Sequence, residues 1–145
     1  MDADPLPSPA AVGLLLRQAH RRFAQAFAEQ LQPLGLENRQ AGLLLQIEQA
    51  GTATQRRLIE LFGTDKSTMV RTIDELELRG LAVRRPHPGD RRAHAVEVTP
   101  AGRELLARVR AGAAEAGSSL LAGFEPAEQE QLRALLTRIV SGDQR

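Results

Sequence analysis

Residues 65–102 of the chain read DKSTMVRTIDELELRGLAVRRPHPGDRRAHAVEVTPAG, and this stretch decides the fold. Its first part, Asp65 to Arg79, carries apolar residues at helical spacing. These residues are Met69, Ile73 and Leu76. Spacing by four and then three residues is typical of a helix that buries one face against a core. Gly80 is expected to end this helix, because glycine readily adopts the conformation that follows a helical C-terminus.

Two short strands are predicted after this helix, over Leu81–Arg85 and His94–Val98. The second one alternates between two faces, as a strand in a half-buried sheet does. The loop that joins them is expected to contain Pro86, Pro88, Gly89 and Asp90. Thr99-Pro100 then predicts another helix, because a hydroxyl at the N-cap and a proline at the first helical position both favour helix initiation.

The residues before this stretch predict two more helices. One covers about Glu37–Ala50, and a shorter one begins near Ala53 or Thr54. The turn FGTD follows the shorter helix, with Gly63 able to take a positive φ and Thr64 or Asp65 able to cap the next helix. A short helix, a turn and a second helix make a helix-turn-helix, and a hairpin directly after them makes a winged one.

Long helices are predicted at both ends of the chain, over Pro9–Gln32, from Thr99-Pro100 to about Leu121, and from Glu125-Pro126 to Gly142. The fold class is therefore mainly α with a small β-hairpin wing. The apolar stripes on the first and last helices exceed what three short helices can cover. They are explained either by a larger core within one chain or by a subunit interface, and we favour the interface.

Composition narrows the possible functions. The chain has no cysteine, which excludes disulfides, thiolate zinc sites and thiol-based redox sensing. It has neither an N-terminal export signal nor an apolar run long enough to span a membrane, so we expect a cytoplasmic protein with no membrane partner. The three histidines lack metal-ligand spacing, and no nucleophile or paired-carboxylate motif suggests an enzyme. No cofactor or metal is expected.

The positive charge is concentrated in the hairpin. The net charge of the whole chain is only +1, but residues 84–92 contain four arginines and one aspartate. This local charge of +3 leaves −2 for the rest of the chain. A focal basic patch on an otherwise near-neutral protein indicates a contact site for a polyanion.

Residues 65–102 resemble the MarR family of bacterial transcriptional regulators. The matching residues are Ser67, Thr68, Arg71, Asp74, Leu76, Arg79-Gly80-Leu81, Arg85, Asp90, Arg92, Val98-Thr99 and Gly102. Arg84 departs from the pattern by adding a charge beside Arg85. The resemblance implies a homodimer that binds pseudo-palindromic double-stranded operator DNA. It also implies repression as the usual activity and often a small-molecule effector, bound between the dimerisation helices and the winged lobe, that lowers DNA affinity.

The expected organisation is a flexible arm at 1–9, dimerisation helices at 10–36 and 100–145, and a winged helix-turn-helix lobe at 37–99. On the recognition helix, the residues expected to contact DNA are Lys66, Ser67, Thr68, Val70 and Arg71. On the wing they are Arg84, Arg85, Asp90, Arg91 and Arg92. Arg39, Thr54 and Gln55 are equally well explained as phosphate contacts or as capping and solvated residues.

The roles of these residues follow from their chemistry. Short polar side chains and arginine on an outward helix face can contact base edges in the major groove, whereas Val70 suits either the core or a thymine methyl. An arginine at a hairpin tip can enter the minor groove, and Asp90 is expected to orient Arg92 for that contact. The alternative is a winged-helix adaptor that binds proteins and not DNA, but such an adaptor does not need an arginine-rich tip.

Overall fold

The computed structural model describes residues 9–142, except for the side chains of Asp90 and Arg91. Its elements are α1 (Pro9–Leu31), the 3-10 helix η1 (Gln32–Leu34), α2 (Asn38–Ala50), β1 (Ala53–Thr54), α3 (Gln55–Phe62), α4 (Lys66–Leu78), β2 (Ala82–His87), β3 (Asp90–Val98), α5 (Pro100–Leu120) and α6 (Pro126–Ser141). The predicted mainly helical fold with a hairpin wing is confirmed. Of the expected arm, residues 1–8 lie outside the described residues, and Pro9 is the first residue of α1.

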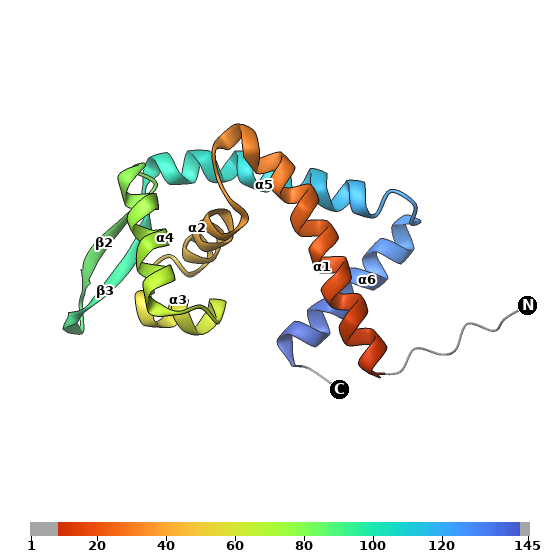
Figure 1. The fold of residues 1–145 in the computed structure, drawn as a ribbon, viewed down its shortest axis with the longest axis horizontal. Coiled ribbons are helices and arrows are strands. Elements are labelled where there is room, and N and C mark those ends of the chain that lie inside the picture. Colours follow the sequence, from red (N-terminus) through yellow and green to blue (C-terminus); the bar gives the residue numbers. More distant parts are fainter. Residues whose placement is uncertain (1–8, 143–145) are drawn as a thin grey trace, which may run out of the picture.

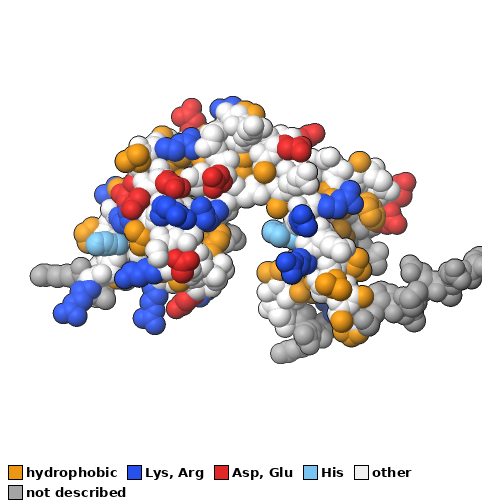
Figure 2. Space-filling view, in the orientation of Figure 1, with side chains coloured by type: hydrophobic (Ala, Val, Ile, Leu, Met, Phe, Trp, Pro, Cys, Tyr) orange, Lys and Arg blue, Asp and Glu red, His pale blue; other side chains and the backbone are white. Residues whose placement is uncertain are grey.

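The elements are arranged in two parts joined by a long helix (Figure 1). One part contains α2, α3, α4 and the hairpin, which we call the lobe. α5 runs from the end of the hairpin to the other part, where α1 and α6 lie (Figure 1). The space-filling view shows a hollow between the two parts (Figure 2). This arrangement places the hairpin and α6 at opposite ends of the molecule (Figure 1).

The core joins α1, the helices of the lobe, the sheet and α5. Its fully buried side chains are Leu31, Leu43, Leu44, Ile47, Leu58, Ile73, Leu76, Val96, Leu106 and Val109. Phe23 and Phe27 of α1 stack with their ring centroids 5.6 Å apart. By contrast, Leu14, Leu15 and Leu16 of α1 are exposed, and none of the described residues of α6 is buried. The single chain therefore leaves the apolar residues at the start of α1 and along α6 exposed, whereas Phe27 and Leu31 at the end of α1 belong to its core.

The sheet differs from the sequence prediction in two respects. It has three antiparallel strands in the order β1-β3-β2, and the two-residue β1 pairs with Ala95 and Val96 of β3. The hairpin is also longer than predicted, because Pro86 pairs with His94 and His87 pairs with Asp90, so that only Pro88 and Gly89 form the turn. Pro86 is tolerated in β2 because β2 is an edge strand and has a bulge directly after Pro86.

A tight junction joins α4, the hairpin and α5. The Thr99 hydroxyl donates to the Gly80 carbonyl oxygen at 2.6 Å and accepts from the Gly102 amide at 3.1 Å, capping α5 as predicted. A Cβ atom on Gly102 would lie 2.2 Å from the Leu81 carbonyl oxygen, so only glycine fits. This junction fixes how the hairpin is joined to α4 and α5.

Candidate nucleic-acid interface

The turn between α3 and α4 sets the start of α4. Gly63 has a φ of 58°, in the left-handed region that favours glycine. The Asp65 carboxylate caps α4 by accepting from the Thr68 amide at 2.8 Å and from the Thr68 hydroxyl at 2.8 Å. These two hydrogen bonds lower the pKa of Asp65 below its ordinary value of 3.8. The first turn of α4 is therefore fixed by its own side chains.

The outward face of α4 carries the residues that the sequence identified. Lys66, Ser67 and Arg71 are exposed, whereas Met69, Thr72, Ile73 and Leu76 are buried on the opposite face. Thr68 is half-buried, and its hydroxyl is already engaged by Asp65. Helix α4 thus presents two long cationic side chains and one short hydroxyl to solvent.

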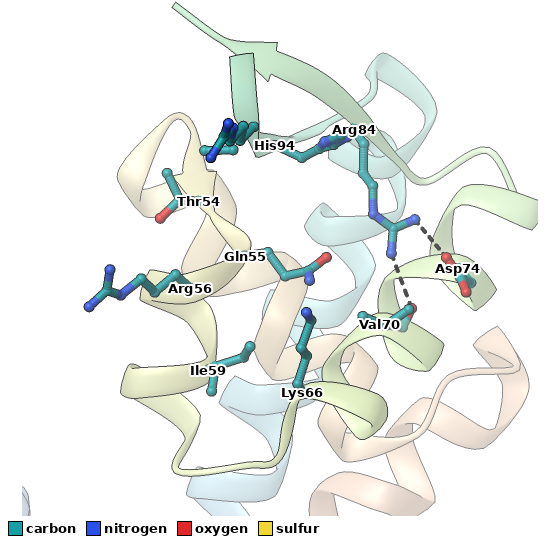
Figure 3. A pocket seen from close by; sticks show the side chains of 11 residues that line it. Thr54, Gln55, Arg56, Ile59, Lys66, Val70, Asp74, Arg84 and His94 are labelled. Atoms are coloured by element: carbon teal, nitrogen blue, oxygen red, sulfur yellow. Dashed lines mark hydrogen bonds and ion pairs between the residues drawn. The ribbon is translucent and has the colours of Figure 1, made fainter. Parts of the chain in front are cut away.

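A groove of about 700 Å³ separates α3 and α4 from the hairpin (Figure 3). It is lined by Thr54, Gln55, Arg56, Ile59, Lys66, Val70, Asp74, Arg84, Arg92, Ala93 and His94. Several sequence candidates therefore meet on one surface, namely Thr54, Gln55, Lys66, Val70, Arg84 and Arg92. Val70, which suited either the core or the outer surface, is half-buried and lines the groove.

The side chain of Arg84 extends from β2 to α4. Its guanidinium donates to Asp74 Oδ1 at 2.6 Å, to Glu77 Oε1 and to the Val70 carbonyl oxygen at 3.2 Å, all on α4 (Figure 3). Its side chain is only 20% exposed. Arg84 therefore attaches β2 to α4 within one lobe.

The other wing arginines are placed differently. Arg85 is exposed and its Nε donates to Glu97 Oε2 across the hairpin at 2.9 Å. Arg92 is exposed near the tip and also lines the groove. The predicted Asp90–Arg92 contact and the role of Arg91 involve side chains outside the described part of the hairpin, so both stay predictions.

Three residues outside α4 and the wing were considered as backbone contacts, and the structure separates them. Thr54 caps α3 by accepting from the Arg57 amide at 3.2 Å, and it lines the groove together with Gln55. Arg39 instead lies on the first turn of α2, 3.6 Å from the Glu37 carboxylate, and it lines a second cavity. The N-terminus of α2 faces α1, so Arg39 is not brought together with the other candidates.

Arg56 is a candidate that the sequence prediction missed. It lies one residue after Gln55 on α3, its side chain is 92% exposed, and it lines the groove. Its position in the first turn of the shorter helix could have indicated a DNA contact, but the only arginines considered as DNA contacts were those of the wing, Arg39 and Arg71 on the recognition helix. Arg56 extends the cationic border of the groove from α4 to α3.

The second cavity, which we call the hinge cavity, lies between α1 and the lobe and has a volume of about 590 Å³. It is lined by His20, Phe23, Ala24, Phe27, Asn38, Arg39, Gly42, Leu43, Phe62, Gly63, Thr64, Met69 and Thr72. The walls are mainly apolar, and Arg39 and His20 add polar nitrogen groups from facing helices. The residues that line this cavity could not be predicted from the sequence, because they come from four separate segments of the chain.

Residues 9–142 contain no group of three or more acidic, histidine or cysteine side chains that could hold a metal ion. None of the helices in this range is both long enough and apolar enough to cross a membrane. His87, beside the wing turn, accepts from the Gly89 amide through its Nδ1 atom at 3.1 Å.

The sequence and the fold of this chain are similar to those of known proteins. A model of the MarR family matches residues 34–93. The HTH-type transcriptional repressor NicR of Pseudomonas putida is 28% identical over 144 residues, covering 99% of this chain and 91% of NicR. The structure of BpsR from Bordetella bronchiseptica, whose DNA binding is regulated by 6-hydroxynicotinic acid, is 28% identical with a TM-score of 0.76, covering 89% and 98% of the two chains.

A MarR-family transcriptional regulator from Rhodococcus sp. RHA1 agrees in both sequence and structure. It is 31% identical to this chain, with a TM-score of 0.81 and coverage of 94% of this chain and 96% of the other. NicR and the Rhodococcus protein are transcriptional regulators and not enzymes, in agreement with the sequence prediction. The family match spans the helix-turn-helix and most of the wing, and the structural match spans nearly the whole chain, so the chain belongs to the MarR family.

Proposed function

We propose that this protein is a homodimeric transcriptional repressor that binds pseudo-palindromic operator DNA and is released by a small-molecule effector. The observation that carries the proposal is the groove between α3, α4 and the hairpin, with Lys66, Arg56 and Arg92 at its borders. Cations from α3, α4 and the hairpin around one groove suit contacts with DNA phosphates. The protein would act in the cytoplasm, where the DNA of a bacterium is found.

Helix α4 is proposed to enter the major groove. Ser67 and Arg71 on its exposed face offer a hydroxyl and a guanidinium to base edges, and Lys66 suits a phosphate. Thr68 is proposed to contribute less to base contacts than its position suggests, because its hydroxyl donates to Asp65. The hairpin tip then reaches the neighbouring minor groove through Arg92, with Arg85 and Arg91 against the backbone.

The dimer is proposed to form through α1 and α6. Leu14 and Leu15 of α1 are 62% and 56% exposed, and Ile139 and Val140 of α6 are 59% and 87% exposed. Apolar side chains concentrated on two helices at one end of a molecule favour association with a second copy, because burying them removes apolar area from water. A two-fold dimer would place the two α4 helices in successive major grooves, about 34 Å apart.

The hinge cavity is proposed as the effector site. The stacked rings of Phe23 and Phe27 and the ring of Phe62 provide apolar walls, while Arg39 can pair with a carboxylate. An aromatic carboxylate fits this chemistry, and 6-hydroxynicotinic acid, which regulates the DNA binding of BpsR, is an available probe. A ligand between α1 and the lobe would stabilise a lobe spacing that does not match the operator.

DNA binding is tested by a mobility-shift assay on the promoter next to the gene at several salt concentrations. The logarithm of the affinity should fall with the logarithm of the salt concentration by about 0.9 per phosphate contact. An affinity that does not change with salt, or no binding to any duplex, would favour the protein-binding adaptor.

The orienting role of Asp90 has its own test. Asp90→Ala should weaken DNA binding even though it removes a negative charge near phosphates, because Arg92 loses the group proposed to orient it. The same assay on the purified variant gives the sign directly. Tighter binding by Asp90→Ala would show that the aspartate acts through simple electrostatic repulsion.

The effector site is tested by filling it. Gly42 lines the hinge cavity, and a Cβ atom there would meet only Phe62 Cε1, at 3.6 Å. Gly42→Leu should keep DNA binding and remove the response to any ligand that dissociates the wild-type complex, with 6-hydroxynicotinic acid as the first probe. Gly117→Leu is the matched control, because a Cβ atom on that helical glycine meets nothing within 4 Å. An equal ligand response in the Gly42→Leu protein would exclude the hinge cavity.

A further inference from the structure

Arg79 occupies a special place in the chain. It is the C-cap residue of α4, and Gly80 and Leu81 separate it from β2, the first strand of the wing. It belongs to the Arg79-Gly80-Leu81 segment that marks the family, yet it does not line the DNA groove. The proposed DNA contacts therefore leave this arginine without a role.

The Arg79 guanidinium connects α4 to the end of the first helix. Its Nη1 donates to the Gly35 carbonyl oxygen at 2.7 Å, and its Nη2 donates to the Leu34 carbonyl oxygen at 3.0 Å. Leu34 ends η1, which continues directly from α1, and Gly35 is its C-cap residue with a φ of 65°. Carbonyl groups at a helix C-terminus lack partners within the helix and carry partial negative charge, so a cation is favourable there. A planar guanidinium can donate to both carbonyls at once, which an ammonium group does not do in a fixed geometry.

Other contacts hold the same end of α4. Gln40 of α2 donates through Nε2 to Glu75 Oε2 at 2.9 Å, and the Thr99 hydroxyl before α5 donates to the Gly80 carbonyl oxygen at 2.6 Å. The C-terminal end of α4 is thus tied to the ends of both long helices, α1 and α5. Its N-terminal half instead borders the hinge cavity through Met69 and Thr72. Among these ties, only Arg79 joins the DNA-reading helix directly to the helix segment that continues α1.

We propose that Arg79 is a positioning residue that sets the angle between α4 and the dimerisation helices. It thereby determines which spacing of the two operator half-sites the dimer accepts. This inference rests on the proposed function, because an angle matters only if two α4 helices bind one duplex. Arg79 itself would contact no base or phosphate, and its effect would reach the DNA through the hydrogen bonds to the Gly35 and Leu34 carbonyl oxygens.

The test begins with the wild-type protein and a randomised duplex library, from which the bound sequences are enriched. Duplexes with the enriched half-sites are then made at the selected spacing and with one base pair inserted or deleted. Arg79→Ala should bind the selected duplex about tenfold more weakly, within the range expected for coupling between sites. Its preference for the selected spacing over the altered spacings should shrink by a similar factor, while its salt dependence stays at the wild-type slope.

Two further variants separate the possible causes. Arg79→Lys keeps the charge but not the two-carbonyl geometry, so it should restore little of the spacing preference. Arg108→Ala removes an exposed charge from α5 and should behave as the wild type does. Circular dichroism measures whether each variant is folded. If Arg79→Ala is not folded, the loss of spacing preference is measured on Arg79→Lys.

The outcomes distinguish the inference from the function on which it rests. If the wild type enriches no sequence, the proposed operator binding fails. If the wild type binds and the Arg79 variants keep both its affinity and its spacing preference, only the positioning role fails. A salt slope reduced by about 0.9 in Arg79→Ala would instead make Arg79 a phosphate contact.

Discussion

Replacing Arg84 by alanine tests whether this arginine holds the wing or binds DNA. The sequence suggested a DNA contact, whereas the structure places the guanidinium against Asp74, Glu77 and the Val70 carbonyl of α4. We therefore expect Arg84→Ala to lower the free energy of unfolding and to weaken DNA binding indirectly, with no change in its salt slope. An unchanged salt slope distinguishes this structural role of Arg84 from a direct contact with a DNA phosphate.

The magnitude follows from the environment of the side chain. Hydrogen bonds to charged groups each contribute about 1.5–3 kcal/mol when buried, and Arg84 is 20% exposed. The side chains of Asp74 and Glu77 are 59% and 32% exposed, so water can replace much of the hydrogen bonding that their carboxylates lose when Arg84 is removed. We expect a total loss of about 2 kcal/mol, near the lower end for one such bond.

Urea unfolding at a fixed protein concentration measures the stability, and mobility shifts at four salt concentrations measure the slope. A double-mutant cycle of Arg84→Ala with Asp74→Ala should give a coupling of about 0.5–1 kcal/mol, as contacting charged pairs do. Arg85→Ala is the matched control for stability, because Arg85 is exposed and its side chain contacts Glu97 on the hairpin and not α4. Its urea midpoint should stay near that of the wild type, whereas its salt slope should fall, because Arg85 is proposed to contact the DNA backbone. An unchanged urea midpoint together with a slope reduced by about 0.9 would refute the structural role of Arg84.

Three other predictions use the same two measurements. Arg92→Ala should weaken DNA binding by about 1 kcal/mol or more and reduce the salt slope by about 0.9, with an unchanged urea midpoint. A salt slope equal to that of the wild type would show that Arg92 does not contact the DNA. Gly102→Ala should destabilise the protein by about 1–3 kcal/mol, because its Cβ would overlap the Leu81 carbonyl oxygen, and a wild-type urea midpoint would show that the junction can relax. Asp65 has a lowered pKa in the folded state, so its stabilisation is present above its ordinary value of 3.8 and is lost as the pH falls through the folded pKa. The difference in urea midpoint between the wild type and Asp65→Ala should therefore close in acid, and a constant difference would mean that the carboxylate charge does not matter.

Much of the fold was predictable because local signals agree with one another. The Thr99-Pro100 start of α5, the Gly63 turn and the Asp65 cap are each decided by residues within one helical turn, and the structure has all three. Gly112 of α5 faces α1. It allows close packing, since a Cβ there would lie 3.0 Å from Gln30 Cβ of α1.

The features that were missed depend on contacts between distant segments. β1 has only two residues, too few for a strand pattern, and it exists because β3 pairs with it. Arg84 and Arg85 are adjacent arginines, and nothing in the sequence says which of them turns toward α4. The partner carboxylates Asp74 and Glu77 are ten and seven residues away and become neighbours only when β2 folds back.

The attachment of α4 at one end has a geometric consequence for repression. A helix of 13 residues is about 20 Å long at about 1.5 Å per residue, and its C-terminal end is held at Arg79 and Gly80. A rotation of about 10° around that end would move its first turn by about 3.4 Å, which is the axial rise of one base pair. An effector in the hinge cavity would therefore need only a small rotation to shift the reading residues out of register by one base pair, without unfolding any element.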